Sequence, residues 1–167
     1  KRIRATRYNP FDYIISLLSY AERNGHTVYF YGGKKHVLEK AEQNVRTSFP
    51  DLKIIGRHAG YVTPATERNV LTAIQKATPA FLLVGRGVKG RELWLYRNRQ
   101  EFKKGLVVWV DDCLEIFAGT KKYAGEKLFA AGLESAAGIL KRPWRFLRIL
   151  RWLYFNILLV IYKIFHL

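Results

Sequence analysis

The sequence predicts an α/β fold: a mostly parallel sheet flanked by helices, Rossmann-like, followed by a basic helical C-terminal appendage. Short apolar runs rich in β-branched and aromatic residues alternate with helical patterns at a spacing of roughly 25 residues, as in successive βαβ units. The carboxyl-terminal residues instead mix cations with aromatic and long apolar side chains, and no acid follows Glu134. We therefore expect an α/β domain over residues 1–130 and an appendage over residues 131–167.

The first helix is expected to begin at Asn9-Pro10, because asparagine is a good N-cap and proline suits the first helical position. Residues 27–30 are β-formers and predict the first strand. A second helix follows, which Pro50 ends. The apolar residues that recur at helical spacing in these two helices are Phe11, Ile14, Leu18 and Ala21, and then Val37, Leu38, Ala41, Val45 and Phe49.

Three further strands are predicted, at residues 52–55, 80–84 and 106–110. The first leads into a loop at 56–61, and Thr63-Pro64 opens the next helix. The central strand at 80–84 is wholly apolar, as buried parallel strands are. The strand at 106–110 ends at Asp111-Asp112. Asp112 is expected to cap a helix that begins at Cys113. The alternative is a divalent-metal site formed by these two aspartates and Glu115.

Glycine turns follow the predicted strands and point to an anion-binding edge. Gly32-Gly33 follows the first strand, and the central strand leads through Gly85, Gly87 and Gly90 into a helix. Strand, glycine turn and helix together aim free backbone N–H groups at an anion such as phosphate. Arg86, Lys89 and Arg91 agree with this in charge, although a solvated connection between strand and helix would look similar.

The amino-acid composition limits the classes of partner that the protein is expected to bind. A hydrophobic content of 49% with 25% charged residues excludes a disordered chain, and the net charge of +16 indicates a polyanionic partner. Cations interleaved with tryptophan and tyrosine suit a membrane interface better than a nucleic-acid groove, so no nucleic acid is expected. The single cysteine and the lack of a signal peptide favour the cytoplasm.

The glycine turn after the central strand also permits a second interpretation. Residues 85–90 read GRGVKG and fit G-x-G-x-x-G, and Asp111 ends the next strand about twenty residues on, where a ribose-binding acid lies in dinucleotide folds. A dinucleotide-binding oxidoreductase domain is therefore the alternative. Against it, two strand-helix units precede the motif. A non-catalytic basic binding module is a further alternative.

A set of short motifs resembles the WecG/TagA/CpsF family of bacterial glycosyltransferases from about residue 25 to residue 150. The motifs follow the family's order and spacing: Gly32-Gly33, Gly56 with Gly60-Tyr61, Val84-Gly85-Arg86-Gly87 with Glu92 and Trp94, Ala118-Gly119, Gly132-Leu133-Glu134, and Pro143-Trp144-Arg145.

This resemblance implies a function. The family transfers an N-acetylmannosamine-type sugar from a uridine-diphosphate (UDP) donor to a polyprenyl-diphosphate-linked acceptor at the cytoplasmic membrane face, for cell-surface polysaccharide or teichoic acid. It implies no tightly bound metal or other cofactor, because cationic side chains neutralise the leaving diphosphate. The substrate-binding residues expected from the turns and the resemblance are Gly32, Gly33, Gly60, Tyr61, Gly85, Arg86, Gly87, Arg91 and Glu92.

The departures from the family concern catalysis. Lys89 and Arg91 replace the family's Pro and Gln, and Asp111-Asp112 replaces a glycine pair. The stretch that supplies the catalytic carboxylate in the family would lie before Lys1, so this is either a fragment or a chain that binds without turnover. Arg145 and Arg148 are the catalytic candidates, since they match carboxy-terminal arginines that the resemblance brings to the active site.

The appendage is expected to lie on an anionic bilayer. Its apolar run, residues 152–162, is shorter than the approximately 20 residues that a spanning helix needs. Four arginines precede or open this run and recur every third residue, which winds them round a helix by about 60° per step: Arg142, Arg145, Arg148 and Arg151. The second half is apolar all round, so it must be buried against lipid or another copy of the chain, and a homo-oligomer is the competing expectation.

Overall fold

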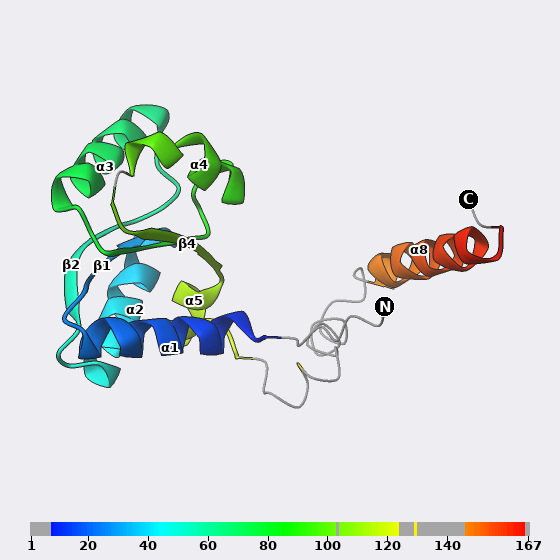
Figure 1. Ribbon diagram of the computed structural model, residues 1–167, viewed down its shortest axis with the longest axis horizontal. Coiled ribbons are helices and arrows are strands. Elements are labelled where there is room, and N and C mark those ends of the chain that lie inside the picture. Colours follow the sequence, from blue (N-terminus) through cyan, green and yellow to red (C-terminus); the bar gives the residue numbers. More distant parts are fainter. Residues whose placement is uncertain (1–7, 103, 124–128, 130–145, 166–167) are drawn as a thin grey trace. The chain divides into compact units, whose positions relative to one another are not determined.

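The computed structural model describes residues 8–102, 104–123, 129 and 146–165. The chain divides between Tyr123 and Ala124 into two compact units. The first contains a four-stranded sheet with helices on both faces, and the second contains helix α8, Phe146–Phe165 (Figure 1). The domain boundary expected near residue 130 falls outside the described residues.

Strands and helices alternate along the first unit, as the sequence predicts. The elements are α1 (Pro10–Arg23), β1 (Thr27–Tyr31), α2 (Lys35–Ser48), β2 (Lys53–His58), α3 (Pro64–Ala77), β3 (Phe81–Gly85), α4 (Glu92–Arg97), the 3-10 helix η1 (Arg99–Glu101), β4 (Leu106–Asp111) and α5 (Cys113–Phe117).

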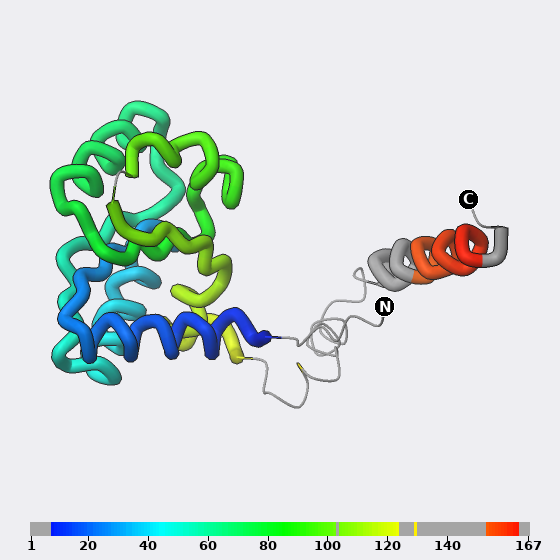
Figure 2. Tube along the Cα trace, viewed as in Figure 1, coloured from blue at the N-terminus to red at the C-terminus, as the bar shows by residue number. Residues whose placement is uncertain are grey.

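All four strands are parallel, in the order β2-β1-β3-β4. From β1 the chain moves outward to β2, then returns past β1 to form β3 and β4 (Figure 2). The direction of winding therefore reverses between β1 and β3. In open parallel sheets, ligands bind beyond the carboxyl ends of the strands at such a reversal. This places the expected site at the turns that follow β1 and β3.

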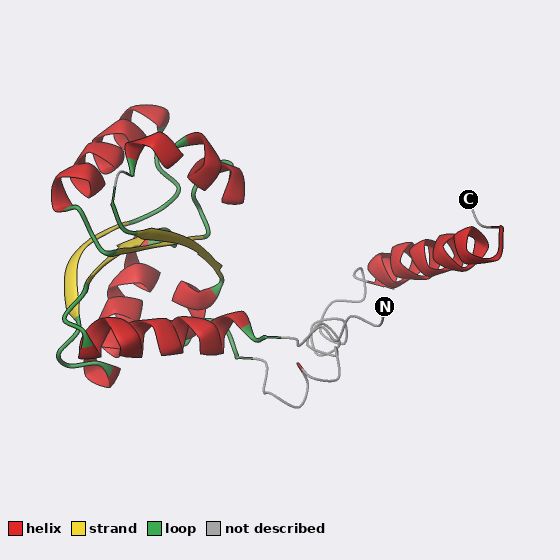
Figure 3. Cartoon of the chain, in the orientation of Figure 1, coloured by secondary structure: helices red, strands yellow, loops and turns green. Residues whose placement is uncertain are grey.

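Helices cover both faces of the sheet, α1, α2 and α5 on one and α3 and α4 on the other (Figure 3). The alternation along β1 explains the two cores. Val28 and Phe30 belong to the first core, whereas Tyr29 and Tyr31 belong to the second. Because both faces are covered, β1 and β3 are buried along nearly their whole length.

Two predicted helix starts are confirmed at atomic detail. The side-chain oxygen of Asn9 accepts from the Phe11 N–H at 3.1 Å, and Pro10 is the first residue of α1. The Thr63 hydroxyl accepts from the Thr66 N–H at 3.3 Å at the start of α3. Each side chain satisfies a backbone donor that the helix itself leaves unpaired.

The loop predicted from Gly56 is wrong at its start, because β2 continues to His58. A Cβ at Gly56 would overlap the ring of Tyr29 on the adjacent strand, so this glycine makes room for an aromatic neighbour within the sheet. The pairing of β1 with β2 shifts register here and omits Ile55. Glycine therefore marks a close approach between strands at this position, where the sequence suggested a turn.

The turn after β1 and the carboxyl end of β3 lie in close contact. Gly32 has φ +137°, and a Cβ there would lie 2.8 Å from the backbone N, Cα and C of Gly85. Real Cβ atoms do not approach backbone this closely, so the position requires glycine. The turn after β1 is thereby pressed against the end of β3.

We predict that Gly32→Ala lowers the free energy of unfolding by about 2–5 kcal/mol, the sum of the left-handed backbone cost and the overlap with Gly85. Gly119→Ala is the matched control: Gly119 also has positive φ, +69°, but a Cβ there meets nothing within 4 Å. It should cost only about 1–2 kcal/mol. Urea unfolding of both variants measures the difference, and equal losses would contradict the close approach.

Candidate functional site

Backbone hydrogen bonds join the turns after β1, β2 and β3 into one surface. The Gly33 N–H donates to the Arg86 carbonyl at 2.6 Å, and the Gly33 carbonyl accepts from the Gly60 N–H at 2.8 Å. The Gly32 N–H donates to the His58 carbonyl at 3.0 Å. These bonds form between turns that are distant in sequence, so the strand ends hold the site in one arrangement.

Tyr61 closes this surface over the turn after β3. Its N–H donates to the Gly87 carbonyl at 2.7 Å, and its ring atoms lie 2.5 Å from where a Cβ of Gly87 would be. Tyr61 itself has a left-handed backbone, φ 57°, and is 65% exposed. The N–H groups of Gly60 and Tyr61 are therefore used within the protein, although both residues lie at the predicted edge.

The same contacts weaken the dinucleotide interpretation of residues 85–90. In that motif the second glycine lets the pyrophosphate approach the backbone, and the third lets the helix pack closely on the strand. Here the Tyr61 ring covers Gly87, and the atoms nearest to a Cβ at Gly90 are 3.7 Å away. The helix that follows, α4, has only 6 residues. The glycines of residues 85–90 instead allow the loop that contains Tyr61 to pack on this turn.

The start of α2 leaves several backbone N–H groups unpaired at this edge. Lys34, at the N-cap, makes no side-chain cap bond, and the first turn contains no acid. The N–H groups of Lys35, His36 and Val37 have no partner among the described residues. Helices α1 and α3 differ, because each has a capping side chain and an acid in its first turn.

This arrangement is electrostatically unfavourable without an anion. The amino end of a helix carries roughly half a positive charge, and α2 adds exposed Lys34 and Lys35 to it. Gly33, next to Lys34, bonds to the Arg86 carbonyl, so α2 begins at the reversal point of the sheet. Free N–H groups, the helix dipole and two lysines all favour a negatively charged ligand here.

A buried carboxylate on α2 pairs with two partly exposed arginines. Glu42 is only 7% exposed, and its carboxylate contacts Arg57 on β2 and, at 2.8 Å, the Nη2 of Arg46. Arg46 also donates to the Ile54 carbonyl at 3.1 Å. Because a buried carboxylate needs its partners, the contact with Arg57 connects α2 to β2. The orientation of its amino end follows from this contact.

Arg86 reaches toward the end of β4. Its Nη1 lies 2.5 Å from an oxygen of Asp112, and its Nε lies 4.0 Å from Asp111. Asp112 also contacts Lys121. Asp112 occupies the position before α5, but its side chain makes no cap bond, so the predicted cap is wrong in its mechanism: the carboxylate binds two cations instead. The guanidinium is half-exposed.

The acids at the end of β4 are the alternative metal site that the sequence offers. Among the described residues, no group of three histidine, cysteine or acidic side chains has a metal-binding arrangement. Burial raises the pKa of Glu115, against the lowering effects of a backbone hydrogen bond and Arg86. Cys113 is buried, and burial with the neighbouring acids raises the pKa of its thiol to about 12, so it stays protonated.

A buried aromatic cluster under the edge is not visible in the sequence. Tyr31, the last residue of β1, is fully buried, and its ring lies 5.2 Å from Trp94 and 6.4 Å from His58. The indole N–H of Trp94 donates to Glu67 of α3. The Tyr31 hydroxyl has no hydrogen-bond partner among the described residues. The only sequence signal for this cluster is Trp94, which belongs to the family motif after β3.

The predicted site residues separate into three groups. The turns after the first three strands bring together Gly32, Gly33, Gly60, Tyr61, Gly85, Arg86 and Gly87. Arg91, with φ 51°, and Glu92 lie at the start of α4 and, among the described residues, make no hydrogen bond to the Gly32-Gly33 turn. Arg145 lies outside the described residues, and Arg148 lies in α8 with its side chain undescribed.

We predict that Tyr31→Phe leaves the free energy of unfolding at pH 7 unchanged or raises it by about 1 kcal/mol, since it removes a buried hydroxyl without a partner. Burial, with a smaller contribution from Glu67, raises the pKa of Tyr31 from 10.0 to about 12. The unfolded chain therefore ionises first. The stability contributed by the neutral phenol is complete below pH 10 and is lost as the pH rises through 12.

The variant should lack this alkaline component, worth up to about 3 kcal/mol. Urea unfolding of both proteins between pH 7 and pH 12 measures it. A variant that is markedly less stable at pH 7 would show that the hydroxyl has a favourable partner.

Comparison with known proteins supports the motif pattern. Two curated relatives are similar over 145 residues, 87% of this chain. One, from Bacillus spizizenii (strain ATCC 23059 / NRRL B-14472 / W23), is 30% identical, and one, from Bacillus subtilis (strain 168), is 27% identical. Both are named N-acetylglucosaminyldiphosphoundecaprenol N-acetyl-beta-D-mannosaminyltransferase. The matched region covers 56% of each relative, so the chain spans about half of their length.

The sequence model of the glycosyl transferase WecG/TagA/CpsF family matches residues 1–167. Together with the parallel sheet and the joined turns at its carboxyl edge, this confirms the predicted family. The chain belongs to the WecG/TagA/CpsF family of glycosyltransferases.

Proposed function

We propose that this chain binds a UDP-sugar of the N-acetylmannosamine type, for transfer to a polyprenyl-diphosphate-linked sugar in cell-surface polysaccharide or teichoic acid synthesis. The observation that carries the proposal is the uncapped start of α2 beside the Gly32-Gly33 turn. The names of the two relatives supply the sugar and the acceptor class. The diphosphate is common to the proposed donor and acceptor, and it is the group for which this edge offers donors.

The residues of the edge divide the recognition between them. Three unpaired N–H groups at the start of α2 point to one phosphate, and Lys34 and Lys35 add charge. The N–H groups of residues 87–90 also lack partners among the described residues and extend the donor surface. Arg86, held between Asp111 and Asp112, is the cation best placed to neutralise a leaving diphosphate, so the proposal needs no metal.

The proposed catalytic residues are different from the residues proposed to bind the donor. Arg145 and Arg148 remain the proposed catalytic candidates from the resemblance. Gly60 and Tyr61 are proposed to shape the edge through their contacts with Gly33 and Gly87. Binding can therefore be tested without turnover, and the choice between an active enzyme and a binding chain is left to an assay with both substrates.

We predict opposite effects of Lys35→Glu on binding and on stability. An acid in the first turn of α2 should raise the free energy of unfolding by about 0.3–1 kcal/mol through the helix dipole. The same acid should weaken UDP binding by at least about tenfold, because it removes a cation and repels the diphosphate. Lys40→Glu is the matched control, since Lys40 is exposed on the same helix but away from its first turn.

Calorimetric titration with UDP, a UDP-sugar and NAD in parallel measures the binding, and urea unfolding measures the stability. The proposal fails if NAD binds tightly while UDP does not, which would support the dinucleotide alternative. It also fails if Lys40→Glu weakens UDP as much as Lys35→Glu. No binding of any of the three would favour a non-catalytic binding module.

We also propose that α8 holds the chain at an anionic membrane surface, on the cytoplasmic side. None of the helices in the described part of the chain is long and apolar enough to cross a bilayer. Along α8 the side chains of residues 153–155 and 157–162 are apolar and exposed, and Arg148, Arg151 and Lys163 supply positive charge. An all-round apolar helix requires a cover, and lipid with anionic headgroups matches both features.

We predict that Leu158→Asp/Ile161→Asp abolishes binding to vesicles containing anionic lipid. Each substitution removes an inserting apolar side chain, worth about 1.5–3 kcal/mol, and adds a charge that the lipid repels by about 1 kcal/mol. The matched control is Leu93→Asp/Tyr96→Asp on α4, which changes two exposed apolar residues at the same spacing. Co-sedimentation at low and high salt is the measurement.

The control should still bind, less strongly at high salt. If the α8 variant binds anionic vesicles as well as the unchanged chain does, the membrane proposal is overturned, and burial of α8 between copies of the chain becomes the better account.

A further inference from the structure

Arg86 shares the carboxylate of Asp112 with a second cation, Lys121. The Nη1 of Arg86 donates to Oδ1 of Asp112 at 2.5 Å, and the Nζ of Lys121 contacts Oδ2 of the same carboxylate. The Asp112 side chain is only 14% exposed, whereas the side chains of both cations are half-exposed. Each oxygen of a largely buried carboxylate therefore has its own cation.

The backbone around Lys121 is attached at two points. The N–H of Lys121 donates to the carbonyl of Glu115 in α5 at 3.1 Å. Two residues further along the chain, the Tyr123 hydroxyl donates to the carboxylate of Asp12 in α1 at 2.8 Å. The ammonium group of Lys121 therefore reaches the shared carboxylate from a backbone that is held on both sides.

The contact of Lys121 with Oδ2 limits how Arg86 can bind Asp112. Arginine and a carboxylate frequently form a bidentate pair, in which two N–H groups bind the two oxygens. Such a pair would commit two of the five guanidinium donors of Arg86 to the protein. Because Lys121 occupies Oδ2, Arg86 binds Oδ1 alone and keeps more of its N–H groups for phosphate oxygens.

The charges at the end of β4 favour the same role. Arg86 lies near two acids, since its Nε is 4.0 Å from Asp111 and its Nη1 contacts Asp112. Two carboxylates outweigh a single guanidinium and would repel a diphosphate. With Lys121 present, two cations face the two acids, so less of this repulsion opposes an anion that binds at Arg86.

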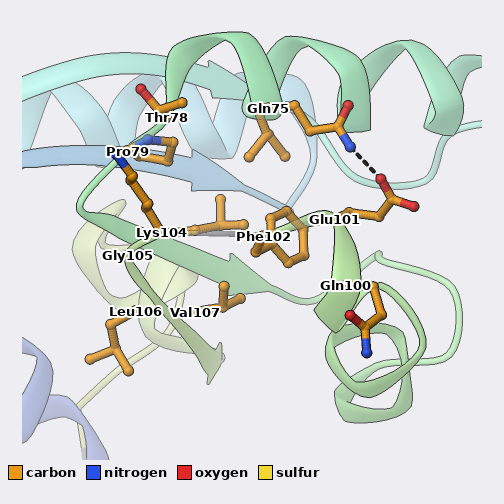
Figure 4. A pocket seen from close by; sticks show the side chains of 12 residues that line it. Gln75, Thr78, Pro79, Gln100, Glu101, Phe102, Lys104, Gly105, Leu106 and Val107 are labelled. Carbon is orange, nitrogen blue, oxygen red and sulfur yellow. Dashed lines mark hydrogen bonds between the residues drawn. The ribbon is translucent and has the colours of Figure 1, made fainter.

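A cavity of about 550 Å³ at the amino end of β4 lies away from this contact (Figure 4). The β4 side of the cavity is lined by residues 104–107, whereas Asp112 follows the last residue of the strand. A hydrogen bond from Gln75 to Glu101 lies at the cavity. Substitutions at Lys121 therefore report on the donor edge and not on the cavity.

We propose that Lys121 is a positioning residue for diphosphate binding: it occupies Oδ2 of Asp112 and thereby keeps Arg86 available to the ligand. The inference rests on the proposed function and adds a residue to it, because Lys121 is not among the residues proposed to touch the donor. Since Lys121 acts through Asp112, its effect on binding should depend on that carboxylate.

The test is calorimetric titration of the full chain with UDP. Lys121→Gln should weaken UDP binding about tenfold, because Arg86 then takes both oxygens of Asp112. Lys121→Arg keeps a cation at Oδ2 and should stay within about threefold of the unchanged chain. Lys122→Gln is the matched control, because Lys122 is exposed and adjacent in the chain. It removes the same charge and should change UDP binding less than about twofold.

A double-mutant cycle shows whether Lys121 acts through Asp112. The side chain of Asp112→Asn has a single acceptor oxygen, so it cannot form a bidentate pair with Arg86. In this background Lys121→Gln should weaken UDP binding less than about threefold. Direct contact of Lys121 with UDP would instead give the same loss in both backgrounds, and that result would overturn the proposal.

The titrations also distinguish the positioning role from the proposed function. If the unchanged chain does not bind UDP, the proposed function fails and the role of Lys121 fails with it. The positioning role alone is overturned if the unchanged chain binds UDP and Lys121→Gln binds it equally well. It is also overturned if Lys121→Arg binds UDP as weakly as Lys121→Gln. Thermal unfolding of each variant checks that it is folded.

Discussion

The close approach of the turn after β1 to the end of β3 is the constraint on which the site depends. Gly32 lies where any Cβ would meet the backbone of Gly85, and hydrogen bonds then connect Gly33 to Arg86 and to Gly60. Because these bonds use backbone groups of three separate turns, no one turn can move without breaking contacts to the others. The amino end of α2 starts from this joined surface, so its position relative to Arg86 is set by the sheet itself and by the Glu42–Arg57 ion pair.

The amino end of α2 differs in its electrostatics from the amino ends of α1 and α3. Helices α1 and α3 each have a capping side chain and an acid in the first turn, and both features offset the helix dipole. Helix α2 has neither, and it carries lysines instead. This arrangement gives a helix no stability of its own, and it agrees with the diphosphate site that we propose. Arg86 differs from these lysines, because its aspartate partners hold its guanidinium in one place and partly neutralise it.

The second half of α8 is apolar on all sides, with exposed side chains at residues 153–155 and 157–162. The backbone of a helix is satisfied internally, so these side chains need only an apolar environment to cover them. Lipid and a second copy of the helix both offer such an environment, and the positive charge of α8 is the reason for proposing anionic lipid.

Much of this protein could be predicted from its sequence alone, because the signals are local. The alternation of strands and helices, the caps at Asn9 and Thr63, and the family motifs depend on residues close together in the chain. The structural role of each glycine could not be predicted from the sequence. Gly56 admits the Tyr29 ring within the sheet, and Gly87 lies under Tyr61, so these contacts follow from which strands become neighbours. The same holds for Asp112, whose carboxylate binds Arg86 and Lys121 where the sequence suggested a cap. Local propensity determined the elements, whereas the order β2-β1-β3-β4 decided which side chains and backbone groups meet, because that order is set by long-range packing.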